Sequence, residues 1–251
     1  MLIFSILISL LLNIPASPFE IDTVKNHNDL SISIETDQNA SGSIKGRIVY
    51  AKGATKKTLK VIKDEKTCGT GDLIDESLVT DENGGLLWTV ISIEGGVAGQ
   101  NDLSKLNSGY TLDQLNCVFS PHVALTGVNQ DLTITNQDKT LHNVRTISFM
   151  NDPINKIQMY LPGGEAPSDK FSFSEPEVIE VKCDVHGWMK AYVHVVEHQY
   201  YAVTNSAGEF EITGLPNGKY TLNVWHEFLG VMSKEIVVND GEASDVELVY
   251  N

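Results

Sequence analysis

The sequence predicts an all-β protein, because strand-like alternation is common in it and helical periodicity is nearly absent. Ile179, Val181 and Cys183 fall on one face of an extended segment, whereas Glu180 and Lys182 fall on the other. Runs of this kind are separated by stretches rich in Gly, Asn and Asp, which favour turns. This combination is typical of β-sandwiches. A length of 251 residues allows one or two such domains.

Several segments show this alternation or a short apolar run. In chain order, the predicted strands lie within residues 44–50, 86–93, 132–136, 179–183, 189–195, 209–212, 220–224 and 246–250. The continuous apolar run 86–93 predicts a strand that is buried on both faces. Asn217-Gly218 predicts a tight hairpin between the strands on either side of it.

The amino-terminal residues 2–12 are apolar apart from two serines, a run shorter than the roughly 20 residues that span a bilayer. Small residues follow, and we expect a signal peptide over residues 1–17 that is cleaved near Ala16. No Lys or Arg precedes the apolar run, so an uncleaved anchor or a misplaced start stays open as an alternative. The expected protein is periplasmic or secreted, without a membrane span after cleavage. The polar, aperiodic residues 18–42 are expected to form a linker.

The charge of the chain is unevenly distributed. Its 18 Lys and Arg residues and 33 Asp and Glu residues give a net charge of −15. Such a chain is a poor candidate for nucleic-acid binding and would attract basic partners at long range. Residues 43–63 nevertheless contain seven basic residues and no acidic one. The simpler interpretation is a solvated strand pair lying against an acidic body, and a docking patch is the alternative.

The segment from Val181 to Met189 carries the chemistry, because it places Cys183, His186 and Met189 in a C-x2-H-x2-M pattern between two predicted strands. A further candidate, His142, lies beyond the predicted strand 132–136. A thiolate, two imidazoles and a weak axial thioether describe a trigonal blue-copper site. With Cys183 at the end of one strand and Met189 at the start of the next, the loop would fold its donors around one point.

Three other interpretations compete with copper. The first is a structural zinc site, but Met is not a usual ligand of structural zinc. The second is a catalytic cysteine, but Met189 has no role beside such a nucleophile. The third is a buried Cys and Met in an ordinary core with the two histidines on turns, and it would require this spacing to arise by chance.

The C-x2-H-x2-M pattern and the distant His-Asn pair resemble the mononuclear cupredoxins over residues 110–197, with a short, amicyanin-like ligand loop. The resemblance implies a Greek-key sandwich that binds one type 1 copper ion. The implied ligands are His142, Cys183 and His186, with Met189 axial. Asn143 matches the position whose side chain ties the two ligand loops together in that family. The second cysteine of the dinuclear copper centre of cytochrome oxidase is missing, and nothing resembles the additional histidines of multicopper oxidases or nitrite reductases.

Other residues near the pattern also have expected roles. Trp188 lies between two implied ligands and is expected to shield the site from water or to form a docking surface. With Cys183 assigned to the metal, Cys68 and Cys117 are left to pair as a disulfide, as an exported protein allows. His122 and His226 could each approach the copper, but we favour hydrogen-bonded histidines at a turn and at a strand end.

Residues 202–220 resemble carboxypeptidase regulatory-like domains, which are transthyretin-like sandwiches often classed with carbohydrate-binding-like folds. This resemblance implies no catalysis. We therefore expect a copper domain over residues 43–197 and a second β-sandwich over residues 198–251. Residues 43–63 could instead supply a strand to the second sandwich.

These expectations favour an exported one-electron carrier that works between redox proteins, of which a basic cytochrome is an example. The alternatives are a copper-binding or copper-delivery protein without electron transfer, and a cell-surface module that binds carbohydrate or protein. We do not expect a substrate-converting enzyme, because Met189 and the two imidazoles would leave no open position on the metal.

Overall fold

The computed structural model describes residues 41–106, 111–239 and 244–251, so the expected signal peptide and most of the expected linker lie outside the described residues. Almost all regular structure in the described part is β-strand, which confirms the predicted fold class. Among these residues, no helix has the length and apolar character needed to cross a membrane.

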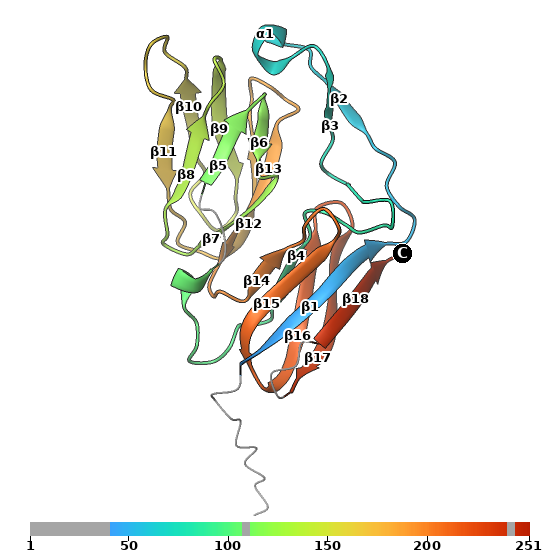
Figure 1. The fold of residues 1–251 in the computed structure, drawn as a ribbon. Helices are drawn as coiled ribbons and strands as arrows, with labels where there is room; N and C mark the ends of the chain where they lie inside the picture. The colour runs from blue at the N-terminus through green and yellow to red at the C-terminus, as the bar shows by residue number, and fades with distance from the viewer. Residues whose placement is uncertain (1–40, 107–110, 240–243) are drawn as a thin grey trace, which may run out of the picture. The chain divides into compact units, whose positions relative to one another are not determined.

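A first sandwich holds the segments that the ligand pattern occupies (Figure 1). One sheet has the strand order β10-β9-β12-β13-β7 and the other has the order β11-β8-β5-β6. The strands are β5 (Thr111–Leu115), β6 (Val118–Ser120), β7 (Val123–Gly127), β8 (Leu132–Asn136), β9 (Leu141–Ile147), β10 (Asn155–Met159), β11 (Ser168–Phe171), β12 (Glu177–Lys182) and β13 (Lys190–Val196).

The core of this sandwich follows the alternation seen in the sequence. Leu132 and Ile134 of β8 point into it, and so do Ile179 and Val181 of β12. The strands β12 and β13 pair antiparallel, with Lys182 opposite Lys190. The chain between them is therefore a closed loop of residues 183–189, and this loop contains the predicted Cys, His and Met donors.

A second sandwich consists of a sheet with the order β15-β1-β18 and a sheet with the order β14-β4-β16-β17. Its strands are β1 (Ser41–Tyr50), β4 (Val90–Ile93), β14 (Tyr201–Val203), β15 (Glu209–Pro216), β16 (Gly218–His226), β17 (Gly230–Val238) and β18 (Ser244–Tyr250). The strand β1 runs antiparallel to β15 and parallel to β18. The first described strand therefore pairs with strands near the carboxy terminus and not with those around the ligand loop.

Neighbouring strands approach β1 so closely at Gly46 that no side chain fits there. A Cβ atom on Gly46 would lie 2.3 Å from the carbonyl oxygen of Val246 and 2.8 Å from the ring of Phe210. Any larger residue would push β1 away from its neighbours. The side chains of Ile44 and Ile48, on either side of Gly46, are fully buried in the core of the second sandwich.

Two local predictions are wrong. The apolar run 86–93 forms a strand only over β4, because Trp88 has a left-handed backbone, with φ of 60°, that interrupts an extended run. Asn217-Gly218 does not close a hairpin, because β15 and β16 belong to different sheets. The chain crosses between the sheets at this point, and β16 pairs with the following strand β17 instead.

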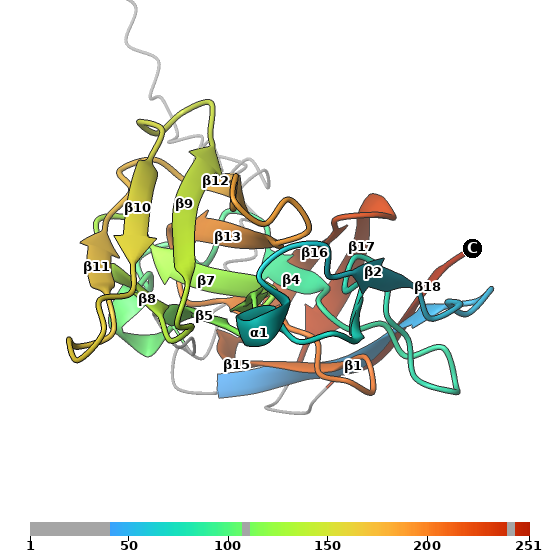
Figure 2. The same ribbon diagram turned by 90° about the horizontal axis from the view of Figure 1, so that it is seen from above.

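Residues 51–80, which we call the arm, leave the second sandwich and contact the ligand-loop end of the first. The arm contains a two-stranded ribbon of β2 (Thr58–Lys60) and β3 (Asp72–Ile74), with a single helical turn, α1 (Glu65–Cys68), between them. Figures 1 and 2 both show α1 beside the first sandwich, to which the disulfide Cys68–Cys117 ties it. The remaining helical element is the 3-10 turn η1 (Leu103–Lys105).

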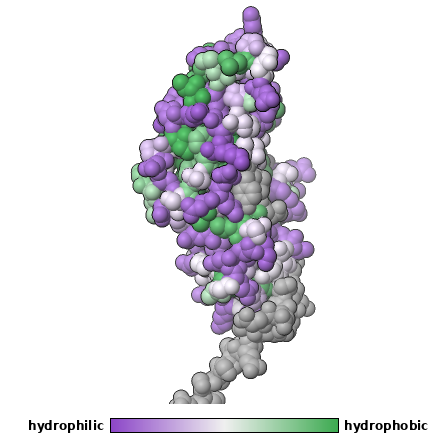
Figure 3. Space-filling view, turned by 90° about the vertical axis from the view of Figure 1, so that its left-hand side faces the viewer, coloured by the Kyte–Doolittle hydropathy of each residue, from purple (hydrophilic) through white to green (hydrophobic). Residues whose placement is uncertain are grey.

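A third apolar cluster, which we call the seam, joins strands of the two sandwiches. Its buried members are Val90, Leu106, Val123, Leu125 and Val196. The ring of Trp225 on β16 lies 4.5 Å from that of His194 and 5.2 Å from that of Tyr192, both on β13. Figure 3 shows one face of the described region, where exposed apolar side chains interrupt a hydrophilic surface.

Candidate metal centre

The loop between β12 and β13 is held by its own backbone. The amide of Met189 donates to the carbonyl of His186 at 2.8 Å, and the amide of Cys183 donates to the carbonyl of Met189 at 3.4 Å. These bonds close the loop as a tight turn around His186. The short spacing of the pattern therefore brings Cys183, His186 and Met189 to one end of the sandwich.

Three donor atoms converge at this end. The Nδ1 atoms of His142 and His186 are 3.0 Å apart, and the Sγ of Cys183 lies 3.8 Å from the first and 3.9 Å from the second. Metal bonds of about 2.0 Å to nitrogen and about 2.3 Å to a thiolate would let one ion touch all three atoms. The three residues are buried, as is Met189. One buried ion of a metal that accepts sulfur and imidazole ligands fits this set.

Carboxylates hold the far nitrogens of both imidazoles. Nε2 of His142 lies 2.9 Å from Oδ2 of Asp138, and Nε2 of His186 lies 2.9 Å from Oδ2 of Asp64. A proton on each Nε2 leaves Nδ1 with a free lone pair that faces the other donors. The carboxylates therefore set the tautomer that a metal ligand needs.

Asp138 is itself fixed in place. Its two carboxylate oxygens accept backbone N–H groups of Asn116 and Cys117, each at 2.7 Å. Burial works against the charged carboxylate, but the hydrogen bonds to His142 and to the two amides hold the pKa of Asp138 below its usual range. Burial likewise opposes a charge on His142, yet the Asp138 carboxylate and the Cys183 sulfur raise the pKa of His142.

His186 differs from His142 in its electrostatic surroundings. Burial lowers the pKa of His186, and the nearby His142 acts in the same direction. The hydrogen bond to Asp64 opposes this shift without reversing it. The free imidazole of His186 is therefore biased toward the neutral form that binds a metal.

The Cys183 sulfur is surrounded by hydrogen-bond donors. Its Sγ accepts the backbone N–H of Asn143 at 3.5 Å and that of His186 at 3.4 Å. Burial raises the pKa of the Cys183 thiol, but the interaction with the His142 ring and the hydrogen bonds from these amides outweigh burial and lower it. The surroundings of Cys183 thus favour the thiolate, the form in which cysteine binds metals.

Asn143 and Trp188 support the loop from opposite sides. The Asn143 side chain accepts the amide of Asp184 at 2.6 Å and donates to the Asp184 carboxylate at 3.1 Å. It thereby links β9, which holds His142, to the loop that holds Cys183. The Trp188 ring lies 5.2 Å from that of His186, and its Nε1 donates to the carbonyl of Cys117 at 3.0 Å. This half-buried indole covers one side of His186.

The predicted disulfide is present and lies close to the donors. Cys68 of α1 is bonded to Cys117, which follows β5. The Sγ atoms of both cysteines lie within 4.8 Å of a ring nitrogen of His186. Because their sulfurs are bonded to each other, Cys183 is the free cysteine among the three, all of which the structure describes.

His122 and His226 lie outside the convergent group. Nε2 of His122 is hydrogen-bonded to the carboxylate of Glu227, which also pairs with Lys190. His226 accepts the amides of Phe228 and Leu229 through Nδ1, at 3.2 and 3.3 Å. Both histidines thus have the hydrogen-bonding surroundings that the sequence analysis favoured for them.

The sequence analysis missed the two carboxylates. Asp138 could have been noticed, because it precedes His142 by four residues in the same connection. Asp64 carries no such signal, since 122 residues separate it from His186. Only the path of the arm brings it to the site.

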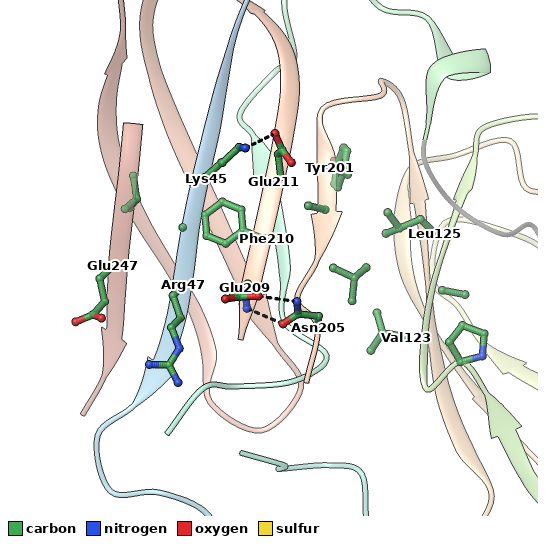
Figure 4. A pocket seen from close by; sticks show the side chains of 16 residues that line it. Lys45, Arg47, Val123, Leu125, Tyr201, Asn205, Glu209, Phe210, Glu211 and Glu247 are labelled. Atoms are coloured by element: carbon green, nitrogen blue, oxygen red, sulfur yellow. Dashed lines mark hydrogen bonds and ion pairs between the residues drawn. The ribbon is translucent and has the colours of Figure 1, made fainter. Parts of the chain in front are cut away.

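A separate cavity lies away from the convergent donors. A cavity of about 950 Å³ opens between β1 and β15 of the second sandwich and β7 of the first. Figure 4 shows two pairs among its polar side chains, Lys45 with Glu211 and Asn205 with Glu209. No group of potential metal donors among the described residues falls in this cavity, so the chemistry is concentrated at Cys183.

Comparisons with known proteins give partial likenesses. The model of one family, polysaccharide lyase family 4, domain II, matches residues 168–246. This match differs from the carboxypeptidase regulatory-like resemblance, and it extends from β11 of the first sandwich into the second. Turn chemistry around Gly and Pro, on which that resemblance rested, is shared by many small β-sandwiches. No curated protein matches the chain.

Three solved structures are similar to part of the chain. A copper-containing nitrite reductase from Thermus scotoductus is 21% identical with a TM-score of 0.29, and the match covers 35% of this chain and 22% of that one. A purple cupredoxin from Nitrosopumilus maritimus is 24% identical with a TM-score of 0.27, and the match covers 32% of this chain and 82% of that one. An oxidised amicyanin variant is 16% identical with a TM-score of 0.30, and the match covers 49% of this chain and 94% of that one.

Proposed function

We propose that this protein is an exported, type 1 blue-copper protein that carries single electrons between redox proteins. The observation that carries the proposal is the buried triangle of Cys183 Sγ with the Nδ1 atoms of His142 and His186. Met189 lies buried in the same loop, and its thioether would supply the weak fourth ligand of such a site. A bound copper ion would supply the Cu(II)/Cu(I) couple.

The surroundings of the ligands favour a carrier over a protein that delivers copper. Each imidazole is held by a carboxylate, the thiolate is held by two amides, and Asn143 ties the two ligand segments together. Ligands fixed in this way change position little when the charge of the metal changes. Delivery of copper requires ligands that release the metal easily, and the full burial of His142 and His186 opposes such release.

The disulfide supports export. Disulfides persist in secreted and periplasmic proteins and are rare in the cytosol. Cys68 and Cys117 form one beside the candidate site. We therefore propose that the protein works outside the cytosol and binds one copper ion there.

Copper titration of the apoprotein tests the function. We expect an intense visible thiolate-to-copper absorption at one equivalent of Cu(II), which is lost in Cys183→Ser and retained in the control His194→Phe. Voltammetry should then show a reversible one-electron couple. A colourless Cu(II) complex would refute the blue-copper site, and rapid loss of the metal to an acceptor chelator during redox cycling would favour delivery.

A further inference from the structure

The candidate ligands have no exposed edge of their own. The side chains of His142 and His186 are 0% exposed, and those of Cys183 and Met189 are 2% exposed. Electron transfer weakens steeply with distance, so a partner must dock where the covering layer over a ligand is thin. The surface above the ligands therefore decides which partner fits.

Part of that covering layer is the arm. Asp64 of the arm bonds to Nε2 of His186, and its own side chain is 37% exposed. One hydrogen-bonded residue thus separates a buried ligand from solvent at this place. The hydroxyl of Thr140 also donates to Asp64, at 3.3 Å.

The arm is fastened over the ligand rather than lying loosely beside it. The disulfide from Cys68 fixes α1 four residues after Asp64, and Asp64 itself accepts the amides of Thr67 and Cys68 through its backbone carbonyl. These bonds hold the arm between His186 and any partner that approaches from this side. The outward surface of the arm is then part of the docking surface.

That outward surface is basic. Residues 52–66 contain six lysines and two acidic residues, one of which is Asp64 with its bond to His186. The six lysines are all exposed: Lys52, Lys56, Lys57, Lys60, Lys63 and Lys66. Within the part of the chain that the structure describes, Lys56, Lys60, Lys63 and Lys66 form no ion pair.

The acidic residues of the returning half of the arm are engaged with the chain itself. Asp72 accepts the hydroxyl of Thr58, Asp75 accepts the amide of Ser77, and Glu76 accepts Nε1 of Trp88. Glu65 is the exposed acidic residue among the lysines. Residues 52–66, with six lysines against Asp64 and Glu65, carry a net charge of +4, although the whole chain carries −15.

An apolar side chain lies within this basic surface. Ile62 is 79% exposed and falls between Lys60 and Lys63 in the sequence. An apolar centre with a charged rim is the usual anatomy of a protein–protein interface. A purely electrostatic surface, such as one that binds a polyanion, has no need of it.

We propose that the lysine-rich outer surface of the arm, residues 56–66, is the docking site for the redox partner, and that the partner presents an acidic surface there. The proposal rests on the electron-carrier function proposed above. The net charge of the chain favours a basic partner at long range, but at contact distances the nearest charges dominate because salt screens the others within about 8–10 Å. The positive arm would orient an acidic partner over Asp64 and His186.

Small charged oxidants test the sign of the local field. As the salt concentration rises, we expect the copper-loaded, reduced protein to react more slowly with trianionic hexacyanoferrate(III). Over the same salt range, its reaction with cationic tris(phenanthroline)cobalt(III) should become faster. The double variant Lys60→Glu/Lys63→Glu should slow the anionic reaction roughly tenfold, within the range of electrostatic steering. The matched variant Lys219→Glu/Lys234→Glu, on exposed lysines of the second sandwich, should change it by less than about twofold.

A second measurement does not require the metal. Paramagnetic hexacyanochromate(III), added to the apoprotein, should broaden the backbone NMR signals of residues 56–66 and should not do so in Lys60→Glu/Lys63→Glu. If the anion binds there but copper gives no blue centre, the proposed function fails and the basic site stands. If the blue centre forms but the hexacyanoferrate(III) rate rises with salt, the net charge governs approach and the docking proposal is overturned.

Vesicles decide between a protein and a membrane as the occupant. The apoprotein should not sediment with phosphatidylglycerol vesicles at physiological ionic strength. Sedimentation that is lost in Lys60→Glu/Lys63→Glu would assign the arm to an anionic membrane and overturn a protein partner.

Discussion

His142 on β9 and His186 on the ligand loop are buried like His194 and His226 on β13 and β16, yet the ring nitrogens of the two pairs have different partners. In the first pair each Nε2 meets a carboxylate and each Nδ1 faces the Cys183 sulfur. In the second pair Nε2 has no hydrogen-bond partner within the described residues. Burial by itself therefore does not mark a functional histidine. The convergence of donors marks it.

The second pair also shows what burial does where Nε2 meets no carboxylate. Burial lowers the pKa of His194 to about 3 and that of His226 to about 4. For His194 burial is the only cause, whereas for His226 the nearby Glu227 and a backbone contact to Leu87 oppose burial without reversing the shift. The ring of His194 packs beside that of Trp225. The comparison gives four predictions, ordered from the largest expected effect to the smallest.

Removal of a ligand should have the largest effect. We expect His142→Ala and His186→Ala to weaken Cu(II) binding by more than about a hundredfold, a larger loss than changes around the ligands usually cause. His194→Phe and His226→Phe should leave the affinity unchanged, because neither ring faces Cys183. Competition titration against a chelator measures all four. Equal losses in the two pairs would mean that the triangle is not the binding site.

Removal of the disulfide comes next. The bond Cys68–Cys117 closes a loop with a sequence separation of 49, so Cys68→Ala/Cys117→Ala should lower the free energy of unfolding by about 4 kcal/mol in the chain-entropy model. Denaturant unfolding checks this value.

The same variant should loosen the arm over the ligand loop without affecting β13. Hydrogen exchange is expected to increase around Asp64 and His186 and to stay unchanged around His194. An even increase throughout the chain would mean that the disulfide stabilises the whole fold and does not specifically fasten the arm.

Acid should destabilise the protein through His194. The folded pKa of about 3 lies below the ordinary histidine value of about 6.5, so the unfolded chain binds a proton that the folded chain does not. Stability from this group is complete above pH 6.5 and falls as the pH drops toward 3, by up to about 1.4 kcal/mol per pH unit. Between pH 6.5 and about 4.5 the loss is about 2–3 kcal/mol.

His194→Phe removes this titration and keeps an aromatic ring against Trp225. Its free energy of unfolding should therefore fall less steeply over the same pH range in apoprotein denaturation curves. Parallel curves for the two proteins would show that His194 is protonated in the folded state.

The smallest effect concerns the carboxylate partners. Asp64→Ala removes the acceptor for Nε2 of His186 and should weaken Cu(II) binding about tenfold, as is common for groups that orient a metal ligand. Asp72→Asn on the same arm is the matched control, because Asp72 contacts Thr58 and not a ligand. An unchanged affinity in Asp64→Ala would mean that the arm covers His186 without orienting it.

Much of the fold could be predicted from short-range patterns. The alternation in residues 132–136 and 179–183 gave the correct buried faces, because a strand that is half buried needs one apolar face. The run 86–93 was misleading because a single left-handed residue, Trp88, interrupts the extended backbone before β4 without leaving a hydropathy signal. Asn217-Gly218 misled because a turn sequence does not state whether its strands share a sheet.

The sequence by itself determined the loop that carries the donors, since the spacing of Cys183, His186 and Met189 is local and a two-residue gap permits one tight turn. It also determined which two cysteines remained to pair. Only the tertiary structure decided that Asp138 and Asp64 hold the imidazoles, that β1 pairs with β18, and that a basic arm covers His186. Such contacts join segments up to about two hundred residues apart, and their positions are set by the packing of sheets, which no local pattern records.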